Sequence, residues 1–434
     1  MTPLEIGIIG IVVLMLLLFA GVPIGITMGL VGFVGIIVIA GPAGAMGVLK
    51  TVPYSTVASY SMSVIPLFVL MGQFALKSKI SADLYVAANK WMGHLPGGLA
   101  VASIMSCAFF SAVCGSSAAT TATIGAVAMP EMKKLKYQPG FSAACLAVGG
   151  TMGIMIPPST AFILYGVIAE QSIGKLFIAG IVPGVLLAIL YAIMTIFISL
   201  RKPEIAPRGD TFGWGDRFKS ILSTLPMLLL FAFIMLGILM GWFTANEAGG
   251  MGAAGAFIIL IFRRRFTFKR LMESLTETVG TAAMVFVIMI GAFIFSYFLT
   301  MSGLPQKIAG FFTGLEVSRY IIIIAILLVY LGLGVIMDEL AMLIITTPIF
   351  LPIVVGLGFD PIWYGVMMVL AMMQGQLTPP VGITLYIIAA TDKDVRLGDV
   401  FKYVMPYLGI LIVFMFVLIA VPDIALILPS LMRS

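Results

Sequence analysis

The amino-acid sequence predicts an all-α polytopic membrane protein with two inverted repeats, each containing a re-entrant helical hairpin and a broken transmembrane helix. Three observations lead to this fold class. The composition is too apolar for a water-soluble fold, long apolar runs recur along the whole chain, and the second half matches the first at a constant offset.

The composition excludes a soluble protein. Of the 434 residues, 61% are hydrophobic and 10% are charged, whereas soluble domains contain about 25% charged residues. A helix that crosses a bilayer needs about 20 predominantly apolar residues. Runs that meet this need together with their uncharged flanks include Ile6–Phe19, Phe177–Leu200, Leu225–Met240, Tyr320–Leu333 and Tyr407–Val421. The first residues lack a basic segment and a cleavage site, so we expect them to start the first helix.

Basic clusters predict the orientation. The segment 201–219 holds five Lys or Arg residues and is expected to link the two halves, and "RRRFTFKR" at 263–270 is a second cluster. Two predicted helices, 222–240 and 244–262, place both clusters on one side, which the positive-inside rule makes cytoplasmic. Lys133, Lys134 and Lys136 belong there too if 140–170 crosses outward and 177–199 returns. Both termini are then expected on the periplasmic side.

An internal repeat appears when the chain is shifted by 222 residues, and transporters are often built this way. The prolines and glycines of "GIMIPPST" fall on those of "GQLTPPVG". The matching pairs are Pro130 with Pro352, Pro139 with Pro361, Gly153 with Gly375, Pro157 with Pro379 and Pro158 with Pro380. We therefore expect two halves of similar structure, roughly 1–200 and 220–434.

Each half contains a segment that suits a hairpin better than two full spans. In the first half, 98–130 lies between loops 90–97 and 131–138, so it is expected to enter and leave on the cytoplasmic side, with its tip at Cys114–Ala118. In the second half, 320–352 has its tip near Gly334–Leu340. Its flanks show no basic excess and indicate entry from the other side; their charged residues are Lys307, Glu316, Arg319 and Asp360.

These elements divide the chain into scaffold and transport parts. Glycines spaced by four residues, Gly21, Gly25 and Gly29, are expected to allow close helix packing in the scaffold. The expected parts are N-terminal scaffold helices 1–97, a first hairpin and broken helix 98–175, scaffold helices 176–300 with loops 201–219 and 263–270, a second hairpin and broken helix 301–400, and a C-terminal helix 401–434.

The candidate chemistry lies where a hairpin tip meets a helix broken at Gly-x-x-x-Pro-Pro. Non-helical backbone at membrane depth is tolerated only where it is buried in protein or lines a cavity. There, free carbonyls can coordinate Na⁺ and half-helix N-termini can face an anion. Hydroxyls and amides nearby are Ser116, Ser117, Thr120, Thr121, Thr151, Gln374, Gln376 and Thr378. An isolated hydroxyl in a membrane helix usually serves packing, but the repetition of tip and break favours a site.

Two adjacent carboxylates stand out within the second tip. An intramembrane carboxylate is costly and indicates function by default. Asp338 is expected either to bind a cation or to cap the second arm of the hairpin. Glu339 is expected to interact with the dipole of the first helical turn.

The sequence argues against enzymes and against nucleotide or nucleic-acid binding. It contains no H-E-x-x-H, G-x-S-x-G or P-loop motif, and its single histidine excludes a multi-histidine metal site. The net charge of +6 reflects the basic loops. Uphill transport would therefore depend on an ion gradient or on a partner.

At this point the motifs resemble a known family. "HLPGGLAVASIMSCAFFSAVCGSSAATTATIGAVAMPEM", "GGTMGIMIPPST", "SIGKLFIAGIVPG" and "LTPPVGITLYIIA" are similar to the large membrane subunit of tripartite ATP-independent periplasmic (TRAP) transporters. The resemblance covers nearly the whole chain. It implies an elevator-type member of the ion-transporter superfamily in the bacterial cytoplasmic (inner) membrane.

The resemblance also implies a substrate class and partners. The family imports small organic acids, such as dicarboxylates or sialic acid, with two or more Na⁺ ions and no nucleotide. A periplasmic substrate-binding protein delivers the substrate, and a small four-helix membrane subunit pairs with the large one. No such four-helix block precedes the first helix here, so we expect the small subunit to be a separate chain.

Family roles carried onto matching positions define two half-sites. The expected Na⁺ ligands are Gly115, Ser116, Gly149, Gly150, Gly153, Gly334, Asp338, Gly375 and Thr378. The expected substrate-binding residues are Ser116, Ser117, Thr151, Ser159, Gln376 and Thr378. Glu339 has no assured role, because the segment between Gly334 and Ala341 varies in the family.

Two other functions remain open from the sequence. One is an autonomous Na⁺/carboxylate symporter of the same superfamily, which would need no binding protein. The other is a non-transporting membrane assembly scaffold, which would not need the repeated tips and breaks.

Overall fold

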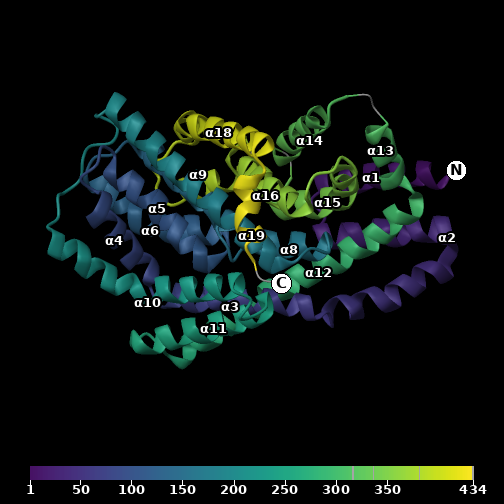
Figure 1. Ribbon diagram of the computed structural model, residues 1–434, viewed down its shortest axis with the longest axis horizontal. Helices are drawn as coiled ribbons and strands as arrows, with labels where there is room; N and C mark the ends of the chain where they lie inside the picture. Colours follow the sequence, from purple (N-terminus) through teal and green to yellow (C-terminus); the bar gives the residue numbers. More distant parts are fainter. Residues whose placement is uncertain (315–316, 336, 381, 433–434) are drawn as a thin grey trace.

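Every regular element is helical in the part of the chain that the computed structural model describes, residues 1–314, 317–335, 337–380 and 382–432 (Figure 1). The first half comprises α1 (Pro3–Phe19), α2 (Ile24–Val57), the short 3₁₀ helix η1 (Tyr60–Ser63), α3 (Val64–Lys77), α4 (Ile80–Met92), α5 (Gly98–Cys114), α6 (Ser117–Lys134), α7 (Pro139–Met155), α8 (Thr160–Ile168) and α9 (Ile173–Arg201). The second half comprises α10 (Trp214–Leu239), α11 (Ala245–Phe262), α12 (Phe268–Ser302), α13 (Leu304–Thr313), α14 (Arg319–Gly334), α15 (Glu339–Gly356), α16 (Pro361–Leu377), α17 (Ile383–Ala389), α18 (Leu397–Ala420) and α19 (Asp423–Ser430).

Nine helical segments among the described residues are long and apolar enough to cross a membrane. Together with the composition, they confirm the prediction of an all-α polytopic membrane protein. The segment made by α7 and α8 differs from the other eight. It is 83% buried over its most apolar stretch, against 33–50% for the others. Protein surrounds this segment, as an interrupted helix at membrane depth requires.

The second hairpin arms and the broken helices of the two halves match at the offset found in the sequence. The second arm of the hairpin begins at Ser117 in α6 and at Glu339 in α15, 222 residues later. Likewise, α7 begins at Pro139 and α16 at Pro361. Proline suits the first helical position, because its missing N–H would have no partner there. The residue before each proline, Gln138 or Asp360, caps the helix by accepting backbone N–H groups.

The predicted hairpins are pairs of helices joined by short turns. The segment expected at 98–130 is α5 and α6, and the segment expected at 320–352 is α14 and α15; their second arms end four residues later than expected, at Lys134 and Gly356. Glu316, among the flanking charges, and Ile336, within the second tip, lie outside the described residues.

The linker expected at 201–219 is shorter than predicted, because α10 begins at Trp214. Trp214 and Phe218 pack edge-on against Trp91 of α4, with ring centroids 6.2 and 5.7 Å away. The Trp91 indole also donates to the Arg217 carbonyl at 3.1 Å. Tertiary packing against α4 thus makes the polar end of the linker helical.

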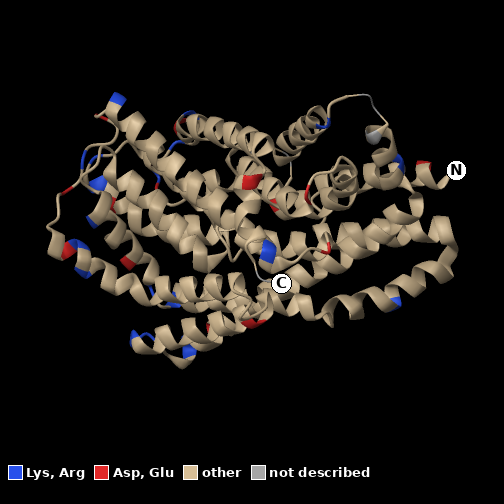
Figure 2. Cartoon of the chain, viewed as in Figure 1, with Lys and Arg blue, Asp and Glu red and all other residues tan. Residues whose placement is uncertain are grey.

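The three basic clusters lie at one end of the molecule, where most Lys and Arg residues gather (left in Figure 2). The linker contacts the loops that flank the first hairpin: Gln138 N donates to Ile205 O, and Gly209 N to Gly93 O, both at 2.9 Å. Arg263, from the second cluster at 263–270, pairs with Asp83 of α4. This common location agrees with the single cytoplasmic side that the sequence predicts.

Glycines bring the long helices α2 and α12 into backbone contact. A Cβ on Gly25 would lie 2.8 Å from Ile288 Cα, and one on Gly32 would lie 2.8 Å from Phe295 Cα. The predicted packing role is therefore confirmed for Gly25. It is wrong for Gly21, which has no neighbour within 4 Å. With φ at +81°, Gly21 instead supplies the left-handed turn between α1 and α2.

Candidate functional site

The helix breaks lie later in the sequence than predicted. Helix α7 continues to Met155, so Gly149, Gly150, Thr151 and Gly153 are helical and not part of the break. The first break comprises residues 156–159. Glycine weakens a helix by only about 1 kcal/mol, whereas a proline disfavours the helical conformation of the residue before it, and two successive prolines also remove two helix donors. Ile156, before Pro157, is accordingly extended, with φ −84° and ψ 119°.

The second break follows the same rule. Helix α16 ends at Leu377, so Gly375 is helical, and Thr378 before Pro379 is extended, with φ −84° and ψ 120°. The break comprises residues 378–382, of which Val381 is outside the described residues. Both Pro-Pro peptide bonds are cis. The expectation that Gly375 is part of an unwound segment is therefore wrong, while Thr378 does belong to the break.

The prolines leave helix carbonyls without backbone N–H donors, and side-chain hydroxyls donate to some of these carbonyls instead. Pro157 and Pro158 have no N–H for the carbonyls of Gly153 and Ile154. Ser159 Oγ donates to Ile154 O at 2.6 Å. In the second half, Thr384 Oγ1 donates to Gln376 O at 3.0 Å. The Gly153 carbonyl thus has no helical donor, which leaves it available as a ligand.

The first tip packs directly on α7 and the first break. Gly115, at φ +63°, makes the turn, and its carbonyl accepts from Thr160 Oγ1 at 3.2 Å. A Cβ on Gly153 would lie 2.6 Å from the Ser116 carbonyl carbon. Gly150 likewise faces Thr121 of α6, and Gly149 faces Cys107 of α5. The helical glycines let the hairpin approach the α7 backbone. This close approach explains the glycine run at 149–153, which in the sequence looks like part of a helix break.

The hydroxyls predicted near the first tip have different environments. Ser116 caps α6 by accepting from Ala119 N at 3.4 Å. Thr151 donates to Val148 O at 2.8 Å within its own helix. The hydroxyls of Ser117 and Thr120 are buried and have no hydrogen-bond partner among the described residues. These two are the free polar groups of the first half-site.

The second tip is also in backbone contact with its broken helix. A Cβ on Gly334 would lie 2.7 Å from Gly375 Cα. The break itself is more open than the first one. Pro380 is exposed and Thr378 is half-buried, whereas Ile156 and Ser159 are 8% and 1% exposed. Gln374 Nε2 donates to Thr378 Oγ1 at 2.8 Å, and Thr378 donates to the Gln374 carbonyl at 2.7 Å.

The two carboxylates of the second tip face different spaces. Asp338 caps α15 by accepting from Leu340 N at 3.1 Å, which confirms the capping interpretation. It also lines an apolar fissure of about 600 Å³ between the tip, the α1–α2 turn and α12. Glu339, in the first turn of α15, lines a cavity of about 10 Å³ that also contacts Gly334, Gly375 and Gln376. We call these spaces the fissure and the tip cavity.

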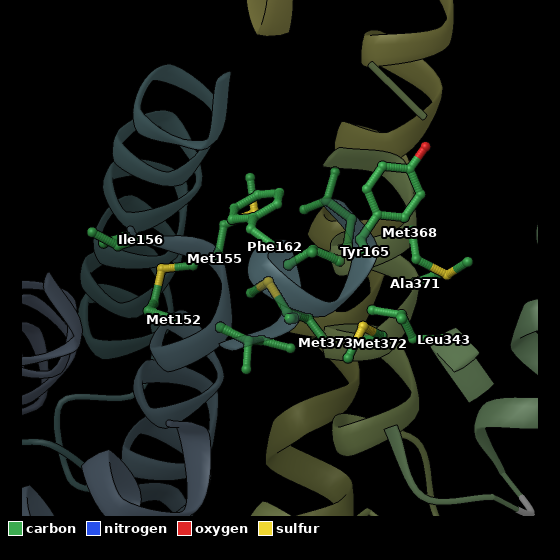
Figure 3. Packing of buried hydrophobic residues seen from close by; sticks show 14 of the residues in the cluster. Met152, Met155, Ile156, Phe162, Tyr165, Leu343, Met368, Ala371, Met372 and Met373 are labelled. Atoms are coloured by element: carbon green, nitrogen blue, oxygen red, sulfur yellow. The ribbon is translucent and has the colours of Figure 1, made fainter. Parts of the chain in front are cut away.

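A methionine-rich apolar core lies between the broken helices. Met152 and Met155 from α7 and Phe162 from α8 pack toward Met368, Met372 and Met373 from α16 (Figure 3). All six side chains are fully buried. Buried apolar side chains, five of the six being flexible methionines, therefore lie between the two broken helices.

Among the described residues, a cavity of about 1220 Å³ is lined by none of the predicted site residues. It lies between the C-terminal part of α2, the α8–α9 turn, the α10–α11 turn and α12. Its lining includes Glu170 and Glu247 and many hydroxyls but neither Lys nor Arg. This cavity, which we call the mouth, lies between elements of the two halves, away from the end of the molecule that carries the basic clusters.

Sequence reasoning missed two residues of this arrangement. Thr160 and Thr384 are hydroxyls that bond to the tip or the broken helix, and each stands two to four residues after a Pro-Pro pair, a spacing that could have identified them. Glu339 is singled out in the sequence but assigned no site role, because no sequence pattern states which of two adjacent carboxylates faces the broken helix.

The fold is that of a solved membrane transporter. The chain is similar to the YdaH transporter of Alcanivorax borkumensis with a TM-score of 0.65, at 15% identity, over 90% of this chain and 91% of that one. At this identity the likeness concerns the fold alone. This fold, together with the candidate spans among the described residues, defines the class as an all-helical multi-pass membrane protein.

Sequence comparisons then identify the family. The model described as "Tripartite ATP-independent periplasmic transporter, DctM component" matches residues 11–424. The chain is 36% identical over 379 residues to the C4-dicarboxylate TRAP transporter large permease protein DctM of Pseudomonas aeruginosa, covering 87% of this chain and 88% of that protein. It is 29% identical over 417 residues to the sialic acid TRAP transporter large permease protein SiaM of Vibrio cholerae, covering 96% of each. It is 34% identical over 416 residues to the isethionate TRAP transporter permease protein DctMQ of Oleidesulfovibrio alaskensis, covering 94% of this chain and 64% of that protein.

This chain belongs to the DctM component family of TRAP transporters. It is a permease of an ATP-independent system and not an enzyme.

Proposed function

We propose that this chain imports a small organic acid together with Na⁺ across the bacterial inner membrane by an elevator mechanism. The observation that carries the proposal is the repeated arrangement of a hairpin tip in backbone contact with a broken helix, at Gly153 and again at Gly375. A membrane scaffold has no need for two such arrangements. The names of the relatives extend from C4-dicarboxylates to isethionate and sialic acid, so we propose the substrate only as a class.

The first half-site suits an anion. Two helices begin there, α6 at Ser117 and α8 at Thr160, and the turn at Gly115 brings their N-termini together. Unpaired N–H groups and the positive end of the helix dipole favour a carboxylate. Ser117 and Thr120 have free hydroxyls to orient it. Ser116, Ser159 and Thr151 complete the proposed substrate side.

The second half-site suits a cation. Asp338 supplies negative charge, and the carbonyl oxygens of Gly334, Gly375 and Thr378 are the proposed neutral ligands; the last two also accept backbone N–H groups, from Thr378 and Gly382. A second Na⁺ would use the Gly115 and Gly153 carbonyls at the first tip. Binding of Na⁺ at both tips would order the organic-acid site between them.

The partners follow from the family. A periplasmic binding protein delivers the substrate, and a small membrane subunit, joined to the permease in the relative named DctMQ, supports the scaffold. The proposed scaffold is α1–α4 and α9–α12, and the proposed transport domain is the two hairpins with α7–α8 and α16–α17. With the basic end cytoplasmic and both termini periplasmic, the halves are inverted and the 1220 Å³ mouth opens toward the binding protein.

Uptake into proteoliposomes tests the proposal. The complete system should accumulate a labelled organic acid from a panel of dicarboxylates, sulfonates and sialic acid when Na⁺ is outside, and not when K⁺ replaces it. Equal uptake in K⁺ would contradict Na⁺ coupling. Uptake without the binding protein would favour an autonomous symporter, and absence of flux for every substrate would favour a scaffold.

A further inference from the structure

We propose that Glu339 and Gln376 form a binding site for one alkali cation in the tip cavity, with the Glu339 carboxylate as its charged ligand. This inference deepens the proposed function and rests on its Na⁺ coupling. It adds to the second half-site a carboxylate and a side-chain amide that the family resemblance does not assign to the ion.

The first argument is the direction of the two carboxylates. Asp338 is engaged with Leu340 N and borders the fissure on the side of α1, α2 and α12. Glu339 borders the tip cavity on the opposite side, between α14, α16 and α17. Of these two carboxylates, Glu339 is therefore the one that faces the broken helix.

The second argument is the unsatisfied polarity of the cavity. Gln376 is 5% exposed, and neither its amide oxygen nor its amide nitrogen has a hydrogen-bond partner among the described residues. The buried Oε2 of Glu339 also lacks one within the same described ranges. Buried amides and carboxylates without partners are costly. Two such groups in one small cavity indicate an occupant that satisfies both.

The third argument identifies the occupant. The cavity holds about one water-sized sphere, which excludes an organic molecule. Its other lining residues are Gly334, Met337, Met342, Met372, Gly375 and Ile383, none of which carries a charge. No lining side chain can balance the charge of an ionised Glu339, so that charge is left to the occupant of the cavity.

A single carboxylate with neutral oxygens matches a hard monovalent ion. Divalent Ca²⁺ takes six to eight oxygen ligands, often from several carboxylates. Soft metals would need thiolate, and the methionine thioethers here are poor ligands for hard ions, so they close the cavity around the oxygen atoms. The small volume favours Na⁺ over the larger K⁺.

Binding of radiolabelled Na⁺ to the purified complex, without substrate, tests this site. Glu339→Gln keeps the shape and removes the charge, so we expect the apparent Na⁺ affinity to fall about tenfold or more, or one bound Na⁺ to be lost. The matched control is Glu204→Gln, an exposed carboxylate in the linker outside the tips and the mouth, which should leave binding within about twofold. K⁺ should compete poorly with Na⁺ in the wild-type complex.

A swap of the two side chains separates binding from folding. The double variant Glu339→Gln with Gln376→Glu returns the carboxylate to the cavity from α16 and should recover most of the lost Na⁺ affinity. A purely structural role for Glu339 predicts no such recovery. Unchanged Na⁺ binding in Glu339→Gln overturns the inference while leaving Na⁺ coupling intact. Absence of Na⁺ binding in the wild-type complex overturns both.

Discussion

The two half-sites share one plan but differ in what they enclose. At the first, hydroxyls and helical glycines are packed closely, and the break between Ile156 and Ser159 is buried. At the second, two carboxylates border empty space on both sides of the tip, and the break at Pro380 is exposed. The first tip is thus a closed, uncharged unit, and the second carries charge and room to move.

The difference indicates that the two tips have different roles although they are built alike. A tip that meets backbone on every side has little freedom, because packed interiors do not deform continuously. A tip that adjoins a 600 Å³ fissure can shift without creating overlap. We therefore expect the second hairpin to respond to ligands and the first to hold a fixed geometry.

The largest expected effect comes from matched substitutions at the two glycines. In Gly153→Ala the new Cβ would lie 2.6 Å from the Ser116 carbonyl carbon, so the first tip must move. We expect a loss of about 1–3 kcal/mol in the free energy of unfolding and loss of uptake. Gly375→Ala should cost less, since its Cβ would lie 2.9 Å from Gly334 Cα beside the tip cavity.

Thermal unfolding in detergent and uptake assays measure both glycine variants. The control is Gly280→Ala in α12, which has no neighbour within 4 Å and should be neutral or slightly stabilising. A larger loss of unfolding free energy in Gly375→Ala than in Gly153→Ala would contradict the conclusion that the first tip is the more tightly packed.

An intermediate effect is expected for a hydrogen-bond network in the second half. Tyr330 of α14 lies 2.5 Å from Tyr364 Oη of α16 and donates to Thr346 of α15 at 3.0 Å. Tyr330→Phe leaves the buried Tyr364 hydroxyl without this partner, which should cost about 1–3 kcal/mol. Tyr364→Phe should cost less, because Tyr330 keeps Thr346.

Chemical denaturation of both tyrosine variants measures these costs. The equivalent positions in the first half are Ala108 and Ser142, so this network is particular to the second hairpin. It joins both hairpin arms to α16 away from the tip. Equal losses in the two variants would contradict the expected hierarchy.

The smallest effect is expected at an exposed ion pair between the first hairpin and the loop after α17. Lys133 Nζ lies 3.0 Å from Asp392 and 2.6 Å from Asp394. The backbone N–H of Asp394 and the Lys133 side chain hold the pKa of Asp392 below its ordinary value. The stabilisation from Asp392 is therefore present above about pH 3.9 and is lost as the pH falls through the lowered pKa.

Lys133→Ala tests the ion pair through its dependence on salt and pH. We expect a slightly lower melting temperature at 0.1 M NaCl and no difference at 1 M, where the screening length falls to about 3 Å. The difference should also vanish in acid. A difference that persists in high salt would indicate packing by the Lys133 stem and not charge.

The sequence predicts the helices and tips well, because these depend on local patterns. Apolar runs, prolines at helix starts and the 222-residue offset place the hairpins to within a few residues. The role of Gly149–Gly153 could not be read locally, since it depends on which helix crosses α7. The directions of Asp338 and Glu339 depend on the helical phase after the tip, and the start of α10 depends on Trp91.

The close contact between α2 and α12 has a consequence for biosynthesis. Gly25 and its partner Gly291 come from opposite halves, 266 residues apart. At about 5–20 residues per second, the ribosome needs roughly 10–50 s to produce the second after the first. During that interval the glycine-rich face of α2 lies in the membrane without its partner α12. The scaffold is completed only when most of the chain has been made.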